Sequence, residues 1–301
     1  MSFWRVAPSW GGWVGVALVL TELGVCVGLV MLLLSWPISI WSFIFGLLAL
    51  VAFAVLVILL YWTYGFFSLY YMLDRDALRI HWAGYETIVP ITDIKGVLTS
   101  DEVTGWETLP HVRWPGYRIG PGFIEDVGPV FYYSVGGGEQ ILVLTDSVSY
   151  AISPEDPLGF LQALELRQSL GPVHRLEPRV VGKGVFAWSF WSDSLAHRLW
   201  LCALVLNLGL FAYVSVVYAD LPPVVPIHFD AGGEVDRLAP AVMVFTMPAI
   251  GMLGLILNGW LGILLHGRQR LATLMLWGST SVIQIYLWLA TLGVTSQRGG
   301  L

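Results

Sequence analysis

The stretch IWSFIFGLLALVAFAVLVILLYWT, Ile40 to Thr63, contains no Asp, Glu, Lys or Arg. About 20 consecutive apolar residues are enough for a helix to cross the hydrocarbon core of a bilayer. A soluble domain seldom offers a continuous apolar environment of that thickness. The stretch therefore predicts a membrane-spanning helix.

Four further apolar runs of membrane length lie on either side of this one. They predict spans at about residues 13–35, 199–218, 240–264 and 271–293. Over the 301 residues, 56% are hydrophobic and 12% are charged, whereas an ordinary soluble domain has about 25% charged residues. The sequence thus predicts an α-helical integral membrane protein with five spans.

One polar block, about Leu73 to Asp193, lies between the second and third spans and is long enough for a small domain. Alternating apolar residues bounded by turn residues predict short strands in it. We expect the glycines at 136–138 to turn the chain between two of these strands and so form a hairpin. The expected strands are LRIHW (78–82), ETIVPI (86–91), VFYYSV (130–135), QILVLTD (140–146) and SYAI (149–152). Residues 95–125 are expected to be mostly loop.

The segment SPEDPLGFLQALELR, which follows these strands, predicts a helix. Ser153 is expected to cap its N-terminus and Pro154 to occupy its first position, where an amide hydrogen is not needed. Phe160, Leu161 and Leu164 form an apolar stripe at helical spacing. The predicted fold of the block is a small β-barrel or sandwich capped by one C-terminal helix.

Basic residues near the span ends predict the orientation, because short cytoplasmic loops are enriched in Lys and Arg. Arg237 and Arg298 lie on one side of a five-span path. The other side holds Arg5, Arg75, Arg79, Lys183, Arg198, Arg268 and Arg270. We therefore expect the N-terminus and the β block to be cytoplasmic and the C-terminus to lie outside.

Three stretches of the β block carry a family resemblance: YYMLDRDALRIHWAGYETIVPITDIKGV (70–97), WPGYRIGPG (114–122) and LTDSVSYAISPEDPLGFLQAL (144–164). Together they resemble the PH-like domain of membrane-anchored bacterial proteins over roughly residues 69–168. The resemblance implies a bacterial plasma-membrane protein. Eukaryotic relatives of this fold often bind phosphoinositide headgroups through Lys and Arg in the first strand-turn-strand.

The charges of this block disfavour such lipid binding. The corresponding turn is Asp74-Arg75-Asp76, and residues 73–190 contain nine Lys or Arg against fifteen Asp or Glu. An acidic domain is repelled by an anionic leaflet. We expect this domain to bind protein rather than phosphoinositide-type lipids.

The loop LPPVVPIHFDAGGEVDR, 221–237, carries a second resemblance. It is similar to the outward loop of a bacterial domain of unknown function, which also occurs in membrane proteins related to the sporulation-toxin immunity protein, and the likeness extends over about 200–293. The expected domains are an N-terminal hairpin (1–68), a PH-like domain with an aromatic juxtamembrane segment (69–193), and a three-span bundle (194–301) with its outward loop at 219–239.

The outward loop is the first candidate site, because its carboxylates and histidine are oxygen and nitrogen donors. Such donors with flexible glycines could hold a divalent cation, but their spacing matches no EF-hand or zinc signature. The alternative is a stiff cap or partner-binding surface, in which prolines fix the path of the chain. We expect the second reading, with no metal and no cofactor. The residues concerned are Pro226, His228, Asp230, Glu234 and Asp236.

Glu22 is the second candidate, because it lies near the middle of the first span. A carboxyl group at bilayer depth is costly unless it is neutral, paired or facing a cavity. Its possible partners are the mid-span polar residues Asn207, Asn258 and Gln284. Either a protonated Glu22 joins helices through hydrogen bonds, or Glu22 has a proton-linked or ligand-linked role.

Other function classes lack support in the sequence. Cys26 and Cys202 both fall inside spans, so they build no disulfide framework or metal cluster. A formal net charge of −6 disfavours nucleic acid as a partner. No nucleophile stands in a recognisable motif with its base, and no phosphate-binding or dinucleotide-binding motif is present.

The sequence therefore predicts a non-enzymatic interaction or regulatory module, anchored in the bilayer, that binds another membrane or envelope protein in an immunity-like or stress-related role. Two alternatives stay open: an accessory subunit of a large membrane complex, and a small proton-coupled transporter or sensor that uses Glu22.

Overall fold

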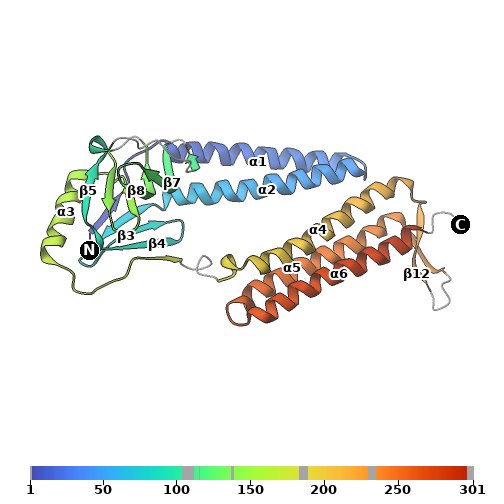
Figure 1. The fold of residues 1–301 in the computed structure, drawn as a ribbon. Coiled ribbons are helices and arrows are strands. Elements are labelled where there is room, and N and C mark those ends of the chain that lie inside the picture. Colours follow the sequence, from blue (N-terminus) through green and yellow to red (C-terminus); the bar gives the residue numbers. More distant parts are fainter. Residues whose placement is uncertain are drawn as a thin grey trace. The chain divides into compact units, whose positions relative to one another are not determined.

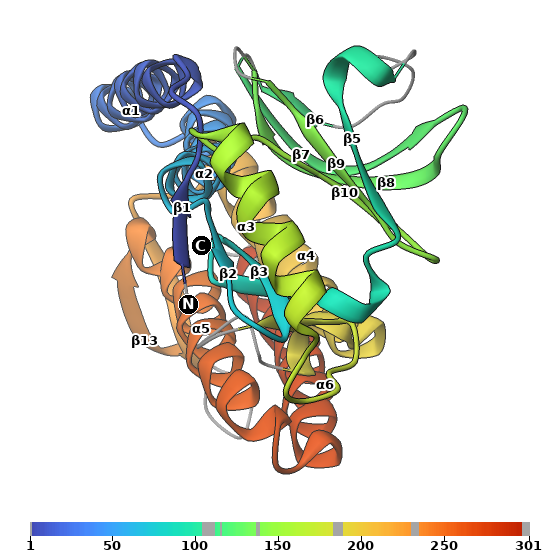
Figure 2. The same ribbon diagram turned by 90° about the vertical axis from the view of Figure 1, so that its left-hand side faces the viewer.

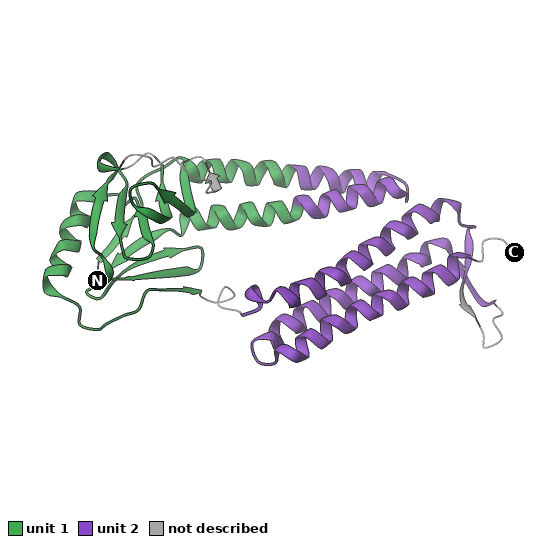
Figure 3. Cartoon of the chain, in the orientation of Figure 1, with its two compact units in different colours: residues 1–24, 53–187 green, residues 25–52, 188–301 purple. Residues whose placement is uncertain are grey.

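The computed structural model describes residues 2–103, 112–114, 116–136, 139–182, 189–229 and 235–296. The chain forms two compact units (Figure 3). Unit 1 comprises residues 1–24 and 53–187, and unit 2 comprises residues 25–52 and 188–301. The boundary between the units therefore falls within the first two helices.

Five helices in the described part of the chain are long and apolar enough to cross a membrane. They are α1 (Gly11–Ser35), α2 (Ile40–Phe67), α4 (Ser194–Val217), α5 (Thr246–His266) and α6 (Arg270–Ser296) (Figure 1). They overlap the five expected spans, so the prediction of a multi-pass membrane protein is confirmed. Many of their large apolar side chains are exposed, as lipid contact requires.

The β domain in unit 1 consists of two sheets. The first has the order β1-β2-β3-β4-β11: β1 (Ser2–Arg5), β2 (Tyr70–Leu73), β3 (Ala77–Trp82), β4 (Tyr85–Pro90) and β11 (Arg179–Gly182). The second has the order β5-β9-β10-β8-β7-β6: β5 (Gly96–Thr99), β9 (Ile141–Leu144), β10 (Ser149–Ile152), β8 (Gly128–Val135), β7 (Tyr117–Ile124) and β6 (Val112–Trp114). Short 3₁₀ helices occur at η1 (Ile91–Asp93), η2 (Ser100–Glu102), η4 (Ser189–Ser192), η5 (Tyr218–Asp220) and η6 (Ala241–Phe245).

Helix α3 (Pro157–Leu170) packs beside both sheets (Figure 2). Its residues Phe160 and Leu164 are fully buried, and they share one core with Leu78 of the first sheet and Ile141 of the second. Burying large apolar side chains from all three elements in one cluster is what holds the layers together. The predicted β domain with one capping helix is confirmed.

Strand β1 comes from the very start of the described chain and was not expected from the sequence. It pairs antiparallel with β2, so that Ser2 lies opposite Leu73 and Arg5 opposite Tyr70. The pairing is extended by Ala7, whose N–H donates to the carbonyl oxygen of Ser153 at 2.9 Å. Because α1 follows β1 and α2 leads into β2, one sheet holds both ends of the helical hairpin.

Aromatic rings join the end of α2 to the β domain. The rings of Trp62 and Trp82 lie 5.7 Å apart, and those of Phe66 and Tyr117 lie 5.3 Å apart. Gly65 allows this approach, because a Cβ there would lie 2.7 Å from the indole nitrogen of Trp82. Trp82 Nε1 also donates a hydrogen bond to the hydroxyl of Tyr117. The β domain is thus packed directly onto its membrane helix.

The expected hairpin between residues 130–135 and 140–146 is wrong. Strands β8 and β9 lie in one sheet, but β10 lies between them, parallel to β8 and antiparallel to β9. Ala151 and Ile152 of β10 are fully buried. All backbone N–H and C=O groups of a buried strand must be hydrogen-bonded. Such a strand is therefore more stable with a neighbouring strand on each edge.

The expected start of α3 is also wrong. Its N-cap is Asp156, whose carboxylate accepts from the N–H of Gly159 at 2.9 Å, and Pro157 takes the first helical position. Ser153 is used elsewhere, because its buried hydroxyl accepts from the N–H of Val135 at 2.8 Å. Ser153-Pro154 and Asp156-Pro157 are equivalent local signals for the start of a helix. Tertiary contacts of Ser153 select the second pair.

Residues 95–125 contain more strand than expected. The eight-residue strand β7 runs through the YRIGPG motif, and Tyr117 and Ile119 point into the main core. Gly116 and Gly120 have φ angles of +74° and +122°, which only glycine adopts readily. Gly116 lies in the turn just before β7, and Gly120 lies within that strand. Residues 104–111 and 115 lie outside the described part of the chain.

In unit 2, α4, α5 and α6 pack together as the C-terminal bundle. Gly262 of α5 lets α6 approach closely, because a Cβ there would collide with the indole of the buried Trp277. At one end of the bundle, β12 (Val224–Phe229) and β13 (Val235–Pro240) form an antiparallel hairpin. Val225 of this hairpin packs with Val214 and Val244.

Candidate functional site

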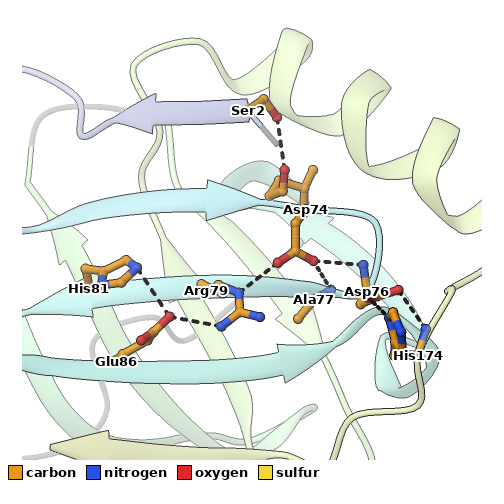
Figure 4. Close-up of polar contacts among 9 residues, drawn as sticks. Ser2, Asp74, Asp76, Ala77, Arg79, His81, Glu86 and His174 are labelled. Atoms are coloured by element: carbon orange, nitrogen blue, oxygen red, sulfur yellow. Dashed lines mark hydrogen bonds and ion pairs between the residues drawn. The ribbon is translucent and has the colours of Figure 1, made fainter. Parts of the chain in front are cut away.

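A row of charged side chains crosses the first sheet of the β domain at the position where the resemblance implied a lipid headgroup (Figure 4). Arg79 Nε lies 2.7 Å from Asp74 Oδ2, and Arg79 Nη1 lies 3.1 Å from Glu86 Oε1. His81 Nε2 lies 3.5 Å from the same oxygen of Glu86. The single Arg of this row is therefore paired with two carboxylates, one in the turn between β2 and β3 and one on the neighbouring strand β4.

Asp74 also organises the turn between β2 and β3. Its Oδ1 accepts from the N–H groups of Asp76 and Ala77 at 2.8 and 2.7 Å. Burial alone would raise the pKa of Asp74, but the hydrogen bonds from Arg79 and the two amides outweigh it, so its pKa lies below the ordinary value. Asp74 stays ionised and holds the turn closed.

The remaining side chains of this turn bind the segment after α3. Asp76 Oδ1 accepts from the N–H of Val173 at 2.6 Å, and its other oxygen lies 3.2 Å from His174 Nδ1. Arg75 donates to the carbonyl oxygens of Leu170 and Gly171 at 3.2 and 3.0 Å. The two bases of the strand-turn-strand, Arg75 and Arg79, are thus both engaged within the domain.

The outer face of α3 carries exposed leucines that the sequence interpretation overlooked. Leu158, Leu166 and Leu170 are 70%, 58% and 56% exposed, whereas Phe160 and Leu164 on the inner face are buried. Val173, just beyond the helix, is 60% exposed. In unit 1, α3 lies at the end of the β domain away from α1 and α2 (Figure 1). These leucines, with the exposed Gln162 and Ser169 between them, form a surface that is here called the α3 face.

The residues predicted in the outward loop are only partly described. Pro226 is buried in β12, and Asp236 is exposed in β13. The backbone of His228 lies opposite Arg237 in an irregular register. Asp230 and Glu234 lie outside the described residues. No group of three His, Cys, Asp or Glu residues that could hold a metal is found in the described part of the chain.

Two of the predicted intramembrane polar residues are brought together in the bundle. Asn207 Nδ2 donates to Gln284 Oε1 and to the carbonyl oxygen of Pro248, both at 3.0 Å. Gln284 Nε2 donates to the carbonyl oxygen of Gly251 at 2.9 Å. Both amide side chains are fully buried. They link α4, α5 and α6 in the manner expected of hydrogen-bonding groups within a bundle.

The other two predicted residues are not part of this network. Asn258 Nδ2 donates to Thr280 Oγ1 at 2.9 Å. Glu22 is half-buried on α1 and belongs to unit 1, whereas the amide network belongs to unit 2. Their coupling therefore stays a prediction.

A further polar cluster joins three residues that are far apart in the sequence, at the end of the bundle where α4 begins. Asp193 is the N-cap of α4 and accepts from two backbone amides. His266 Nε2 lies 3.0 Å from Asp193 Oδ2, and Arg270 Nε lies 2.5 Å from the same oxygen. Hydrogen bonds from Arg270 and His266 lower the pKa of Asp193. Nothing in the sequence paired Asp193 with His266.

The cluster also contains a hydroxyl group beside an imidazole, which the sequence interpretation did not anticipate. Ser189 Oγ lies 3.2 Å from His266 Nδ1. Phe190 of the predicted aromatic segment packs edge-on against Trp277, with ring centres 5.7 Å apart. Phe186 and Trp188 of that segment lie outside the described residues.

Comparison with known proteins agrees with these two regions. A family profile described as a bacterial PH domain matches residues 69–168, and a profile for a domain of unknown function (DUF1648) matches residues 205–252. Each match covers less than half of the chain. No curated protein and no solved structure matches the chain. The β domain is thus similar to bacterial PH domains, and no named relative bears on the resemblance to immunity-type proteins.

Proposed function

We propose that this chain is a non-enzymatic, membrane-anchored interaction module, in which the β domain binds another membrane or envelope protein through the α3 face. The carrying observation is the set of exposed leucines on α3. Apolar side chains clustered on a water-facing helix mark a protein-binding surface more often than an isolated exposed residue does. Lipid around the N-terminal hairpin does not account for them, because within unit 1 α3 lies at the end of the β domain away from α1 and α2.

The closed charge network on the first sheet favours the same function. Arg79 is held by Asp74 and Glu86, and Arg75 by the end of α3. Releasing either base for a headgroup would leave a carboxylate or a carbonyl group without its partner. A protein ligand on α3 requires no such loss.

The attachment of the β domain to α1 and α2 favours a regulatory role. β1 and β2 join the sheet to α1 and α2, and the aromatic rings around Gly65 pack the two parts together. A partner bound at α3 would therefore be held at a fixed position relative to the membrane hairpin.

In the outward loop at the other end of the bundle, five residues are proposed to contact a partner or to brace the loop: Pro226, His228, Asp230, Glu234 and Asp236. An immunity-like or stress-related role and a cytoplasmic β domain belong to the same proposal.

Co-purification from native membranes with matched variants tests the α3 face. Tagged full-length protein is extracted in mild detergent, and bound proteins are quantified by mass spectrometry. The double substitution Leu166→Glu with Leu170→Glu is expected to reduce a stoichiometric partner by about tenfold, because charge is placed in an apolar contact. The control is Thr92→Glu with Ser147→Glu, which adds the same charge at exposed polar positions of the β domain outside α3.

The control pair should retain the partner, and both proteins should unfold at the same temperature. Equal partner recovery from both variants would contradict the role of the α3 face. A protein that is purified alone from native membranes would contradict the proposed function itself. Recovery of many subunits in fixed ratio would instead favour the accessory-subunit alternative.

A further inference from the structure

A polar pocket of about 440 Å³ opens at the end of the bundle where α4 and α6 begin and α5 ends. Three serines (Ser189, Ser192 and Ser194) line it together with Asp193, His266 and Arg270. The proposed partner binding through α3 makes no use of this pocket. Its lining combines hydroxyl, imidazole and guanidinium groups, which are the usual ligands of phosphate groups in proteins.

In this pocket, the buried carboxylate of Asp193 fixes the orientation of the exposed Arg270 side chain. The side chain of Asp193 is 7% exposed, whereas that of Arg270 is 58% exposed. Asp193 accepts from Nε and Nη2 of Arg270 at 2.5 and 3.2 Å. A guanidinium has five N–H groups, so this pairing leaves others available on an arginine whose orientation is already fixed. Less side-chain entropy is then lost when an anion binds.

The charge of this end of the bundle favours an anion. Arg198 and Arg268 lie near the same helix ends as Arg270. Asp193 is the single acid among the described residues at this end, because Asp220 and Asp236 lie near the opposite end of the bundle. The β domain, by contrast, is acidic. A basic pocket between helix ends is a common site for the headgroup of an anionic lipid.

The position of the pocket selects the source of the phosphate. It lies at the first residues of two spans and at the last residue of a third, which is the depth of the lipid headgroups. We propose that this pocket binds the phosphate of an anionic phospholipid, through Arg270 and the serine hydroxyls, on the side of the membrane that carries the β domain. The hydrogen bond between Ser189 and His266 orients one of these hydroxyls.

Native mass spectrometry of the delipidated full-length protein tests the proposal. Phosphatidylglycerol, phosphatidylcholine and inorganic phosphate are titrated separately, which distinguishes an anionic headgroup from a zwitterionic one and from a free anion. Phosphatidylglycerol is expected to bind with the highest affinity. Arg270→Gln should weaken this binding by about tenfold, while Arg198→Gln, which removes the same charge at the same end of the bundle, should change it less than about twofold.

Equal losses of affinity in Arg270→Gln and Arg198→Gln would show that charge alone attracts the lipid. That result would overturn the proposal that the lipid binds in this pocket. Equal affinity for phosphatidylcholine, or for inorganic phosphate, would overturn the assignment of the ligand. Because Arg270→Gln also removes a partner of Asp193, Ser192→Phe serves as a second variant that fills the pocket and keeps the ion pair. It should also weaken binding by about tenfold, and unchanged binding would contradict the site.

Discussion

At the scale of single residues, Asp74 is the group on which the closed network of the first sheet depends. It accepts hydrogen bonds from two backbone amides and from Arg79. Asp74→Asn is expected to destabilise the full-length protein by about 1–2 kcal/mol at pH 7. Asp101→Asn, at an exposed position of the same domain, should cost less than about 0.5 kcal/mol. Thermal unfolding in detergent measures both.

The same residue predicts a pH dependence. The folded-state pKa of Asp74 lies below its ordinary value of about 4, so the unfolded state takes up the proton first. The stability that its carboxylate supplies is therefore complete above about pH 4 and is lost as the pH falls through the folded-state pKa. The difference between the wild type and Asp74→Asn should shrink below pH 4. A difference that is constant down to about pH 3 would contradict the network.

Gly251 and Gly254 on α5 provide a matched pair inside the bundle. A Cβ on Gly251 would lie 2.5 Å from both Asn207 Nδ2 and Gln284 Oε1, whereas a Cβ on Gly254 meets nothing within 4 Å. Gly251→Ala should destabilise the bundle by about 1–3 kcal/mol. Gly254→Ala should be neutral or slightly stabilising. Equal effects on unfolding in detergent would show that the buried amide network does not determine the helix packing.

At the scale of elements, β1 is the connection that attaches the hairpin to the β domain. Its side chains alternate, so that Trp4 packs on Phe160 of α3 with ring centres 5.6 Å apart, while Phe3 is 58% exposed. Trp4→Ala should cost about 2 kcal/mol, and Phe3→Ala less than about 1 kcal/mol. Similar unfolding temperatures for the two variants would contradict the docking of β1 on the core.

The elements also show which parts of the structure could be predicted from the sequence. The spans were predictable, because bilayer thickness fixes the length of the apolar run in each. The pairing of β8, β9 and β10 was not, because a local glycine turn carries no information on a third strand that inserts between its arms. β1 was missed because four residues before a span show too little alternation to indicate a strand.

For the candidate sites too, only features with a local sequence signal could be predicted. Asp74 and Asp76 were recognised as turn residues because turn chemistry is local. The cluster of Asp193, His266 and Arg270 was missed because its members come from three helix ends. The α3 face was missed because Phe160, Leu161 and Leu164 already accounted for an apolar stripe, and a second set of leucines on the same helix gives no signal of exposure.

At the scale of the whole molecule, the proposed orientation puts the α3 face on the cytoplasmic side of the membrane and the outward loop on the outer side. A cysteine at Ser169 should resist a membrane-impermeant maleimide in intact cells, and one at Asp236 should react, in a background with Cys26 and Cys202 replaced. The expectation rests on the distribution of arginines around the spans. The reverse labelling pattern would invert the proposed orientation.

Site-specific photo-crosslinking in native membranes tests the central claim, that the β domain binds a protein through α3, most directly. A photoreactive amino acid replaces Leu166 on the α3 face or, as the control, Glu125 in the β7–β8 turn. The proposed function predicts one protein adduct of defined mass from position 166 and none of that mass from position 125. Only lipid adducts from position 166, or the same adducts from both positions, would contradict it.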